Sequence, residues 1–222
     1  DDATALADAN RAAVDLMRTI AEEWGGRLAG TRVVGTVGPR GDGYAAGSAS
    51  SADEAAEYHS AQVRAFAEAG ADEVVALTLT DTREAMGVAR AARAAGVPAV
   101  LSFTVETDGR LPDGTTLGEA VSTVDAEAPP AWFMVNCAHP QHLLPAFADA
   151  GPWVDRIRGL RCNASTRSHA ELDAAETLDE GDLRVLVPAH RSLEEHLPAL
   201  DVVGGCCGTD ARHVAALWGV GV

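Results

Sequence analysis

The feature that most constrains the fold is a repeated alternation of apolar runs with alanine-rich amphipathic stretches. Each unit consists of a β-branched run, a turn and a helical pattern, and the unit recurs every ~30 residues. Six runs have the near-continuous apolar character of buried parallel strands: residues 32–38, 73–79, 99–105, 132–137, 159–164 and 202–206. This alternation predicts a parallel sheet with helices outside it.

Helical patterns occupy the intervals between these runs. The first expected helix, residues 3–24, precedes every strand. A second helix, residues 52–69, begins after the N-cap residue Ser51 and stops at Gly70. A polar, flexible loop is expected over residues 41–51, after the first strand. Further helices are expected over residues 82–95, 139–150, 168–177, 192–197 and 210–218.

Two architectures fit this order of elements, an open doubly wound sheet and a closed eight-stranded barrel. No G-x-G-x-x-G motif follows the first strand, which weakens the dinucleotide-binding version of the open sheet. A barrel needs eight strands and about 250 residues. If the chain is a barrel, its 222 residues lack about two of the β/α units.

The charge balance limits the classes of partner. Lys and Arg number 17 against 33 Asp and Glu, and the formal net charge is −16. A nucleic-acid partner requires clustered cationic side chains, so this class is excluded. No apolar run approaches the roughly 20 residues that span a bilayer, and no secretory leader is present. We therefore expect a soluble, cytoplasmic protein without a membrane partner.

Three cysteines carry the strongest chemical signal. Cys137 ends one expected strand, and the pair Cys206-Cys207 ends the last. The carboxyl ends of barrel strands meet at one rim, where three thiolates and an open fourth position suit catalytic Zn²⁺. Soft sulfur donors favour Zn²⁺ or Cu(I) over Mg²⁺ or Ca²⁺. Two alternatives remain open, namely a phosphate cradle built on Gly204-Gly205 and a redox-active cysteine pair.

The residues around the cysteine pair fit the metal interpretation. Adjacent side chains on a strand point to opposite faces, so both cysteines reach one metal only if the backbone leaves the strand there. The flanking glycines of the segment 204–208 permit such a departure. The fourth cysteine, Cys162, lies inside an apolar run and is expected to be a small buried hydrophobe.

The segment 203–209, VGGCCGT, resembles the terminal signature of the homocysteine S-methyltransferase family. The segment 135–140, VNCAHP, resembles the other metal-binding segment of that family, and weaker similarity runs through residues 38–41 and 67–75. The resemblance implies an α/β fold, a (β/α)8 TIM-type barrel with about six of eight strands present. Residues 1–222 would then form a single domain that lacks the first one to two β/α units. It also implies Zn²⁺ held by Cys137, Cys206 and Cys207.

The resemblance further implies a reaction. A methyl group would move from a sulfonium or quaternary ammonium donor to the thiol of homocysteine, giving methionine. The expected partners are these small molecules, with a homo-oligomer possible. The alternatives are a catalytically impaired zinc-binding fragment and a relative that acts on another thiol. Substrate-binding residues are expected at the strand ends: Thr78, Ser102, Thr104 and Asn136.

One position departs from the family pattern. The family carries a Glu-Thr pair where this chain has Leu77-Thr78, and that Glu holds the amino group of the acceptor. Glu106, at the end of the next strand, either replaces this carboxylate or is simply solvated.

The histidines give weaker signals. His139 either orients a metal ligand or caps the helix that it precedes. The other histidines are interpreted as surface residues: His59, His142, His169, His190, His196 and His213.

Overall fold

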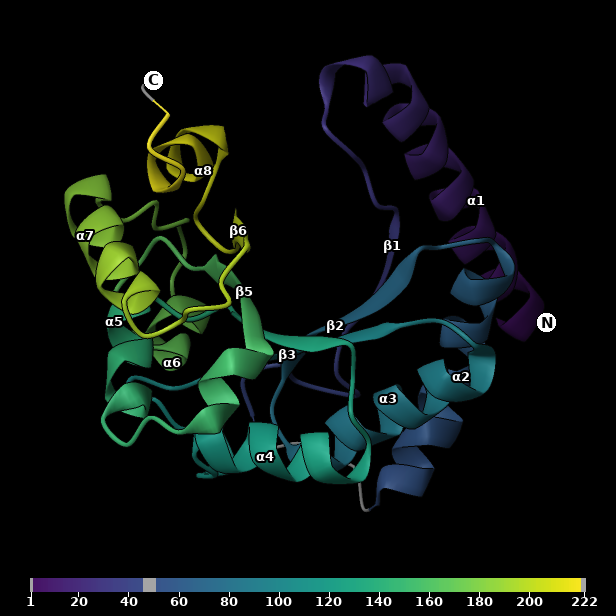
Figure 1. Ribbon diagram of the computed structural model, residues 1–222, viewed down its shortest axis with the longest axis horizontal. Coiled ribbons are helices and arrows are strands. Elements are labelled where there is room, and N and C mark those ends of the chain that lie inside the picture. Colours follow the sequence, from purple (N-terminus) through teal and green to yellow (C-terminus); the bar gives the residue numbers. More distant parts are fainter. Residues whose placement is uncertain (1, 46–50, 221–222) are drawn as a thin grey trace.

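A curled parallel sheet organises the chain, as a computed structural model of residues 2–45 and 51–220 shows (Figure 1). Each strand in this part of the chain pairs in parallel with the strand next in sequence. Residues 46–50 of the expected loop lie outside the described residues. The strands are β1 (Val34–Val37), β2 (Glu73–Leu79), β3 (Ala99–Phe103), β4 (Trp132–Asn136), β5 (Ile157–Cys162) and β6 (Val202–Gly205).

Helices cover the convex side of this sheet, while β1 and β6 lie at its two ends (Figure 1). The sequential strand order confirms a partial TIM-type barrel, because a doubly wound sheet reverses its order at a switch point. The helices are α1 (Asp2–Trp24), α2 (Ala52–Glu68), α3 (Thr82–Ala95), α4 (Leu117–Glu127), α5 (Pro140–Leu143), α6 (His169–Asp173), α7 (Leu183–Glu194) and α8 (Ala211–Leu217). Short 3₁₀ turns are η1 (Gly25–Arg27), η2 (Leu144–Phe147) and η3 (Pro152–Arg156).

The two faces of the sheet are packed differently. Alternate strand residues such as Leu101 and Phe133 join the large core shared with the helices. The residues between them belong to a smaller cluster of Val75, Val100 and Met134, against which Leu77 and Trp132 pack. A strand residue at the rim of the barrel therefore faces either the helices or the barrel interior according to its position in this alternation.

Helix α4 (Leu117–Glu127) was not among the expected helices. It begins with a capping box, in which Thr116 accepts from the backbone of Glu119 and Glu119 accepts from the backbone of Thr116. The Thr-x-x-Glu pattern was visible in the sequence, so this helix could have been predicted.

Three other helix predictions were wrong in their bounds. The expected helix over 139–150 is the single turn α5 followed by the 3₁₀ turn η2, in which Pro145 lies near the start. The expected helix over 192–197 is the end of α7, which begins at Leu183 and contains Pro188. The helix expected over 168–177 ends at Asp173.

Within the described residues, no helix is long and apolar enough to cross a membrane.

The two outer strands generate a prediction about association. Among the described strands, β1 and β6 each pair on one side only, and Val34 and Val202 are 39% and 38% exposed. Such edges recruit further strands. We expect the 222-residue chain to self-associate in light scattering, and the double variant Val34→Lys, Val202→Lys to associate less because lysine blunts edges. Equal association of the two proteins would contradict this.

Candidate metal centre

Three cysteine sulfurs converge at the carboxyl end of the sheet. Cys137 directly follows β4, and Cys206 and Cys207 directly follow β6. Their three Sγ atoms all lie within 4.8 Å of one another, and the Sγ atoms of Cys137 and Cys207 are 3.8 Å apart. Tetrahedral Zn–S bonds of about 2.3 Å place sulfur atoms about 3.8 Å apart. The cluster therefore has the dimensions of a three-cysteine zinc site.

Cys162 does not belong to this cluster. It lies inside β5, is 2% exposed, and is absent from the group of three possible ligands among the described residues. Burial raises the pKa of the Cys162 thiol to about 12, so this side chain stays protonated at neutral pH. The prediction of a small buried hydrophobe is confirmed by its burial.

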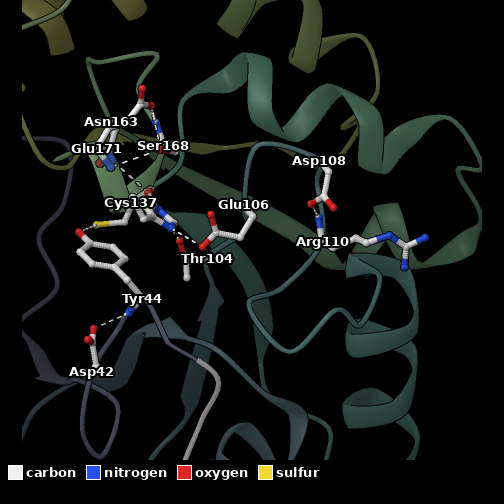
Figure 2. Close-up of polar contacts among 11 residues, drawn as sticks. Asp42, Tyr44, Thr104, Glu106, Asp108, Arg110, Cys137, Asn163, Ser168 and Glu171 are labelled. Carbon is white, nitrogen blue, oxygen red and sulfur yellow. Dashed lines mark hydrogen bonds and ion pairs between the residues drawn. The ribbon is translucent and has the colours of Figure 1, made fainter. Parts of the chain in front are cut away.

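The backbone at Cys137 leaves the strand in an unusual way. Cys137 has a φ of 56°, a left-handed conformation that side-chain-bearing residues seldom adopt. The surroundings hold it there: its N–H donates to the carbonyl of Arg161 at 3.1 Å, and its carbonyl accepts from Asn163 and His169. Figure 2 shows the side chain of Cys137 directed toward Tyr44. Strained backbone of this kind is concentrated at functional sites.

Glycines shape the turn that carries the other two thiols. A Cβ at Gly205 would overlap the side chain of Thr209. Gly208 has a φ of +76°, and a Cβ there would overlap the carbonyl oxygen of Asp179. The Thr209 hydroxyl donates to the carbonyl of Cys206 at 2.6 Å and closes the turn. As expected, the backbone leaves the strand at the glycines, and this departure brings both cysteines into one cluster.

Asn163 connects the two segments that carry the thiols. Its Nδ2 donates to the carbonyl of Cys137 at 3.0 Å, and its Oδ1 accepts from the N–H of Cys207 at 3.2 Å. The side chain is 2% exposed. Sequence reasoning missed this residue because the expected strand over 159–164 included it, whereas β5 ends at Cys162.

The three thiols compete for protons. Hydrogen bonds from Cys137 and Cys206 lower the pKa of Cys207, whereas hydrogen bonding with Cys206 and Cys207, together with burial, raises the pKa of Cys137. Thiolates this close repel one another, so a second or third negative charge in the cluster is disfavoured unless a cation offsets it. A bound divalent cation would remove this conflict, which fits a metal site.

A chain of three side chains, Tyr44, His169 and Glu106, begins beside the thiols. The Tyr44 hydroxyl is 3.9 Å from the Sγ of Cys137 and 3.8 Å from that of Cys207, and burial raises the pKa of Tyr44. The Tyr44 ring stacks on the imidazole of His169 with centroids 4.3 Å apart. The Nδ1 of His169 lies 2.9 Å from a carboxylate oxygen of Glu106. Tyr44 and His169 were not predicted from the sequence.

Three of the four expected substrate-binding residues form one hydrogen-bonded group. The Oδ1 of Asn136 accepts from the N–H of Thr78 at 2.8 Å and from the hydroxyl of Ser102 at 2.5 Å, while its Nδ2 donates to the Thr78 hydroxyl. Thr78 has a φ of 60° and lies where the register between β2 and β3 shifts. Asn136 thus supports a bulge at the rim.

Thr104, the fourth of these residues, is placed differently. It is fully buried, and its hydroxyl lies 3.5 Å from the Nε2 of His169. A role in substrate binding remains a prediction for all four residues.

The interpretation of the histidines was largely wrong. Only His196 of the six supposed surface histidines is exposed; the others are buried, namely His59, His142, His169, His190 and His213. Each buried ring has a carboxylate or carbonyl partner, as His59 has Glu84 at 2.8 Å, and these partners make burial possible. His139 caps α5 by accepting from the N–H of Gln141.

Comparison with solved structures identifies the fold. The chain matches crystal structures of the homocysteine methyltransferase MmuM from Escherichia coli in three forms. The apo form has 22% identity and a TM-score of 0.74, and the match covers 100% of this chain and 75% of that chain. The metallated form has 22% identity and a TM-score of 0.70, and the match covers 92% of this chain and 67% of that chain. The oxidized form has 25% identity and a TM-score of 0.70, and the match covers 93% of this chain and 68% of that chain.

Comparison of sequences identifies the family. None of the curated proteins compared with the chain matches it. A family model described as homocysteine S-methyltransferase matches residues 1–219, nearly the whole chain. The chain therefore belongs to the homocysteine S-methyltransferase family.

Proposed function

We propose that this methyltransferase uses zinc to move a methyl group from a sulfonium or quaternary ammonium donor to the thiol of homocysteine, giving methionine. The observation that carries the proposal is the convergence of three Sγ atoms within 4.8 Å at the carboxyl end of the sheet. All four cysteines are free, as thiolate ligands require, and a reducing compartment preserves free thiols. We therefore place the enzyme in the cytoplasm.

Cys137, Cys206 and Cys207 would hold the zinc ion. When bound, zinc with an open fourth position supplies Lewis acidity that lowers the pKa of an acceptor thiol. One of the matched structures is described as the metallated form of a homocysteine methyltransferase. For this chain the size of the cluster and its three soft donors support zinc.

A cavity beside Cys207 offers room for the substrates. Its volume is about 350 Å³, and it is lined by Tyr44, Cys207 and residues of the segment 172–179. The half-buried Leu172 and the exposed Leu178 contribute apolar surface to its wall. The Tyr44 ring offers a cationic methyl donor an electron-rich face.

Beyond activation of the acceptor thiol, the reaction needs placement of the two substrates. The acceptor thiol loses its proton to solvent, and its sulfur forms a bond to the donor methyl carbon. The bond between that carbon and the donor sulfur or nitrogen breaks, and its electron pair returns to the donor atom. The chain contributes by holding both partners in line, since positioning supplies much of the rate in such displacements.

A direct assay tests the proposed reaction. Zinc-loaded protein is incubated with homocysteine and either S-methylmethionine or betaine, which represent the two donor classes, and methionine is measured by mass spectrometry. We expect methionine from one donor class and a loss of at least about 100-fold in Cys207→Ala, because removing the metal site removes the means of thiol activation. Absence of methionine with both donors would refute the proposed reaction.

The ligand assignment predicts a specific pattern of metal content. Protein purified without chelator should contain about one zinc ion per chain, because the three thiols form one site. Cys207→Ala should abolish tight binding, whereas Cys162→Ala should retain it, since Cys162 lies outside the cluster. Elemental analysis of the purified variants measures this directly. Equal zinc content in the two variants would show that the ligands are assigned wrongly.

The bridge formed by Asn163 predicts a smaller effect. Asn163→Ala removes the side chain that joins the backbones of Cys137 and Cys207, so the zinc affinity should fall about 10- to 100-fold, as for other residues that orient metal ligands. Competition with a fluorescent chelator measures the dissociation constant. Asn10→Ala is the matched control: the half-buried side chain of Asn10 on α1 hydrogen-bonds to Leu6 and Gln62 rather than to the thiol-bearing segments, so this variant should bind zinc like the parent protein. Identical affinities for all three proteins would contradict the bridging role.

A further inference from the structure

The acceptor proposed above carries an ammonium group close to its thiol, and this group needs an anionic partner. The inference below rests on the proposed function. At the rim, strand β2 offers no such partner on the interior side of the sheet. Its residue Leu77 is apolar and packs against the cluster of Val75, Val100 and Met134. A buried ammonium without a partner is costly, so the partner must come from another wall of the site.

Most carboxylates near the thiols are engaged or exposed. Asp179 accepts from the Ser165 hydroxyl and the N–H of Gly181, and it pairs with Arg167. Asp173 and Glu176 line the cavity but are exposed to water, which weakens their hold on an ion. Neither of them has a recorded contact with a residue of the thiol cluster in the described part of the chain.

Glu106 differs from these carboxylates. Its side chain is 34% exposed, and one oxygen meets the Nδ1 of His169 at 2.9 Å. Within residues 2–45 and 51–220 its second oxygen accepts no hydrogen bond. A tight turn fixes its backbone, because its N–H donates to Arg110 at 2.8 Å and its carbonyl accepts from Gly109 at 3.0 Å. The turn and His169 therefore fix the position of the Glu106 carboxylate, and its second oxygen is available to accept a hydrogen bond from a ligand.

His169 fixes the position of this carboxylate relative to the metal ligands. Its Nε2 lies 2.6 Å from the carbonyl oxygen of Cys137, and because a carbonyl only accepts, Nε2 is the donor. Its Nδ1 lies 2.9 Å from a carboxylate oxygen of Glu106. One imidazole thus joins the carboxylate to the backbone of a metal ligand. Figure 2 shows Glu106, Thr104 and Cys137 gathered in one region.

We propose that Glu106 binds the ammonium group of the acceptor amino acid, with His169 as the positioning residue. The carboxylate uses one oxygen on His169 and offers the other to the ammonium. One imidazole separates the carboxylate from the backbone of Cys137, and this is the span that the short carbon chain of homocysteine would bridge between its nitrogen and its sulfur. This contact selects thiols that carry an amino group over thiols of the same length that lack one.

The test compares two thiols and two proteins. Homocysteine and 4-mercaptobutanoate, which has the same chain without the amino group, are titrated calorimetrically into zinc-loaded parent protein and into Glu106→Gln. The glutamine retains an acceptor for His169 but loses the charge. Homocysteine affinity should fall about 10- to 150-fold in the variant, the range for a hydrogen bond to a charged group, while 4-mercaptobutanoate affinity stays unchanged.

Matched variants separate the contact from a general loss of charge. Asp108→Asn removes the same charge two residues along the loop, where the side chain is turned toward the backbone of Arg110 (Figure 2), and should bind both thiols like the parent protein. Glu106→Asp keeps the charge and should retain more homocysteine affinity than Glu106→Gln. Zinc content and circular dichroism confirm that each variant is folded and loaded.

The outcomes separate the two proposals. If the parent protein binds both thiols and Glu106→Gln weakens both equally or neither, the role of Glu106 is refuted and the proposed function stands. If the zinc-loaded parent protein binds neither thiol, the proposed function is refuted together with the inference. If Glu106→Gln does not fold, a homocysteine affinity of Glu106→Asp equal to its 4-mercaptobutanoate affinity would refute the contact.

Discussion

Parallel pairing of neighbouring strands is the constraint on which the site depends. Because every described strand runs in the same direction, the carboxyl ends of β4, β5 and β6 meet at one edge. Cys137 and Cys207 come together across 70 positions of sequence for this reason. Asn163, which directly follows β5, then lies between the two thiol-bearing segments and hydrogen-bonds to both. In an alternating antiparallel sheet, Asn163 after β5 would instead lie at the edge opposite to Cys137 and Cys207.

The architecture and the thiols were predictable because they depend on patterns that the sequence displays directly. Buried parallel strands show as apolar runs, and the glycines around Cys206 and Cys207 mark a departure from the strand. Helix α4 and the full length of α7 were missed, since the first needed attention to a capping box and the second contains Pro188. Propensity alone does not resolve such elements, because tertiary packing overrides it.

The surroundings of the thiols were harder to predict because they depend on contacts between distant segments. His169 lies on a short helix that gives no periodic signal, yet it is buried against Cys137, Glu106 and Tyr44. No local pattern indicates that a loop residue such as Tyr44 will reach the sulfur atoms of two other segments. The same holds for Asn136, whose side chain supports a bulge in a neighbouring strand. These residues become visible only when the strands are placed side by side.

The left-handed backbone at Cys137 has a consequence for how metal and folding are coupled. Hydrogen bonds from Asn163 and His169 to the carbonyl of Cys137 hold this conformation. Contacts within the folded chain therefore offset its backbone strain. For the proposed zinc, the position of Cys137 would then be set by contacts within the chain, and little ordering entropy would remain for the binding step. Zinc would then exchange with a folded protein rather than nucleate one. Its contribution to the free energy of unfolding would follow mass action and vary with the free metal concentration of the cell.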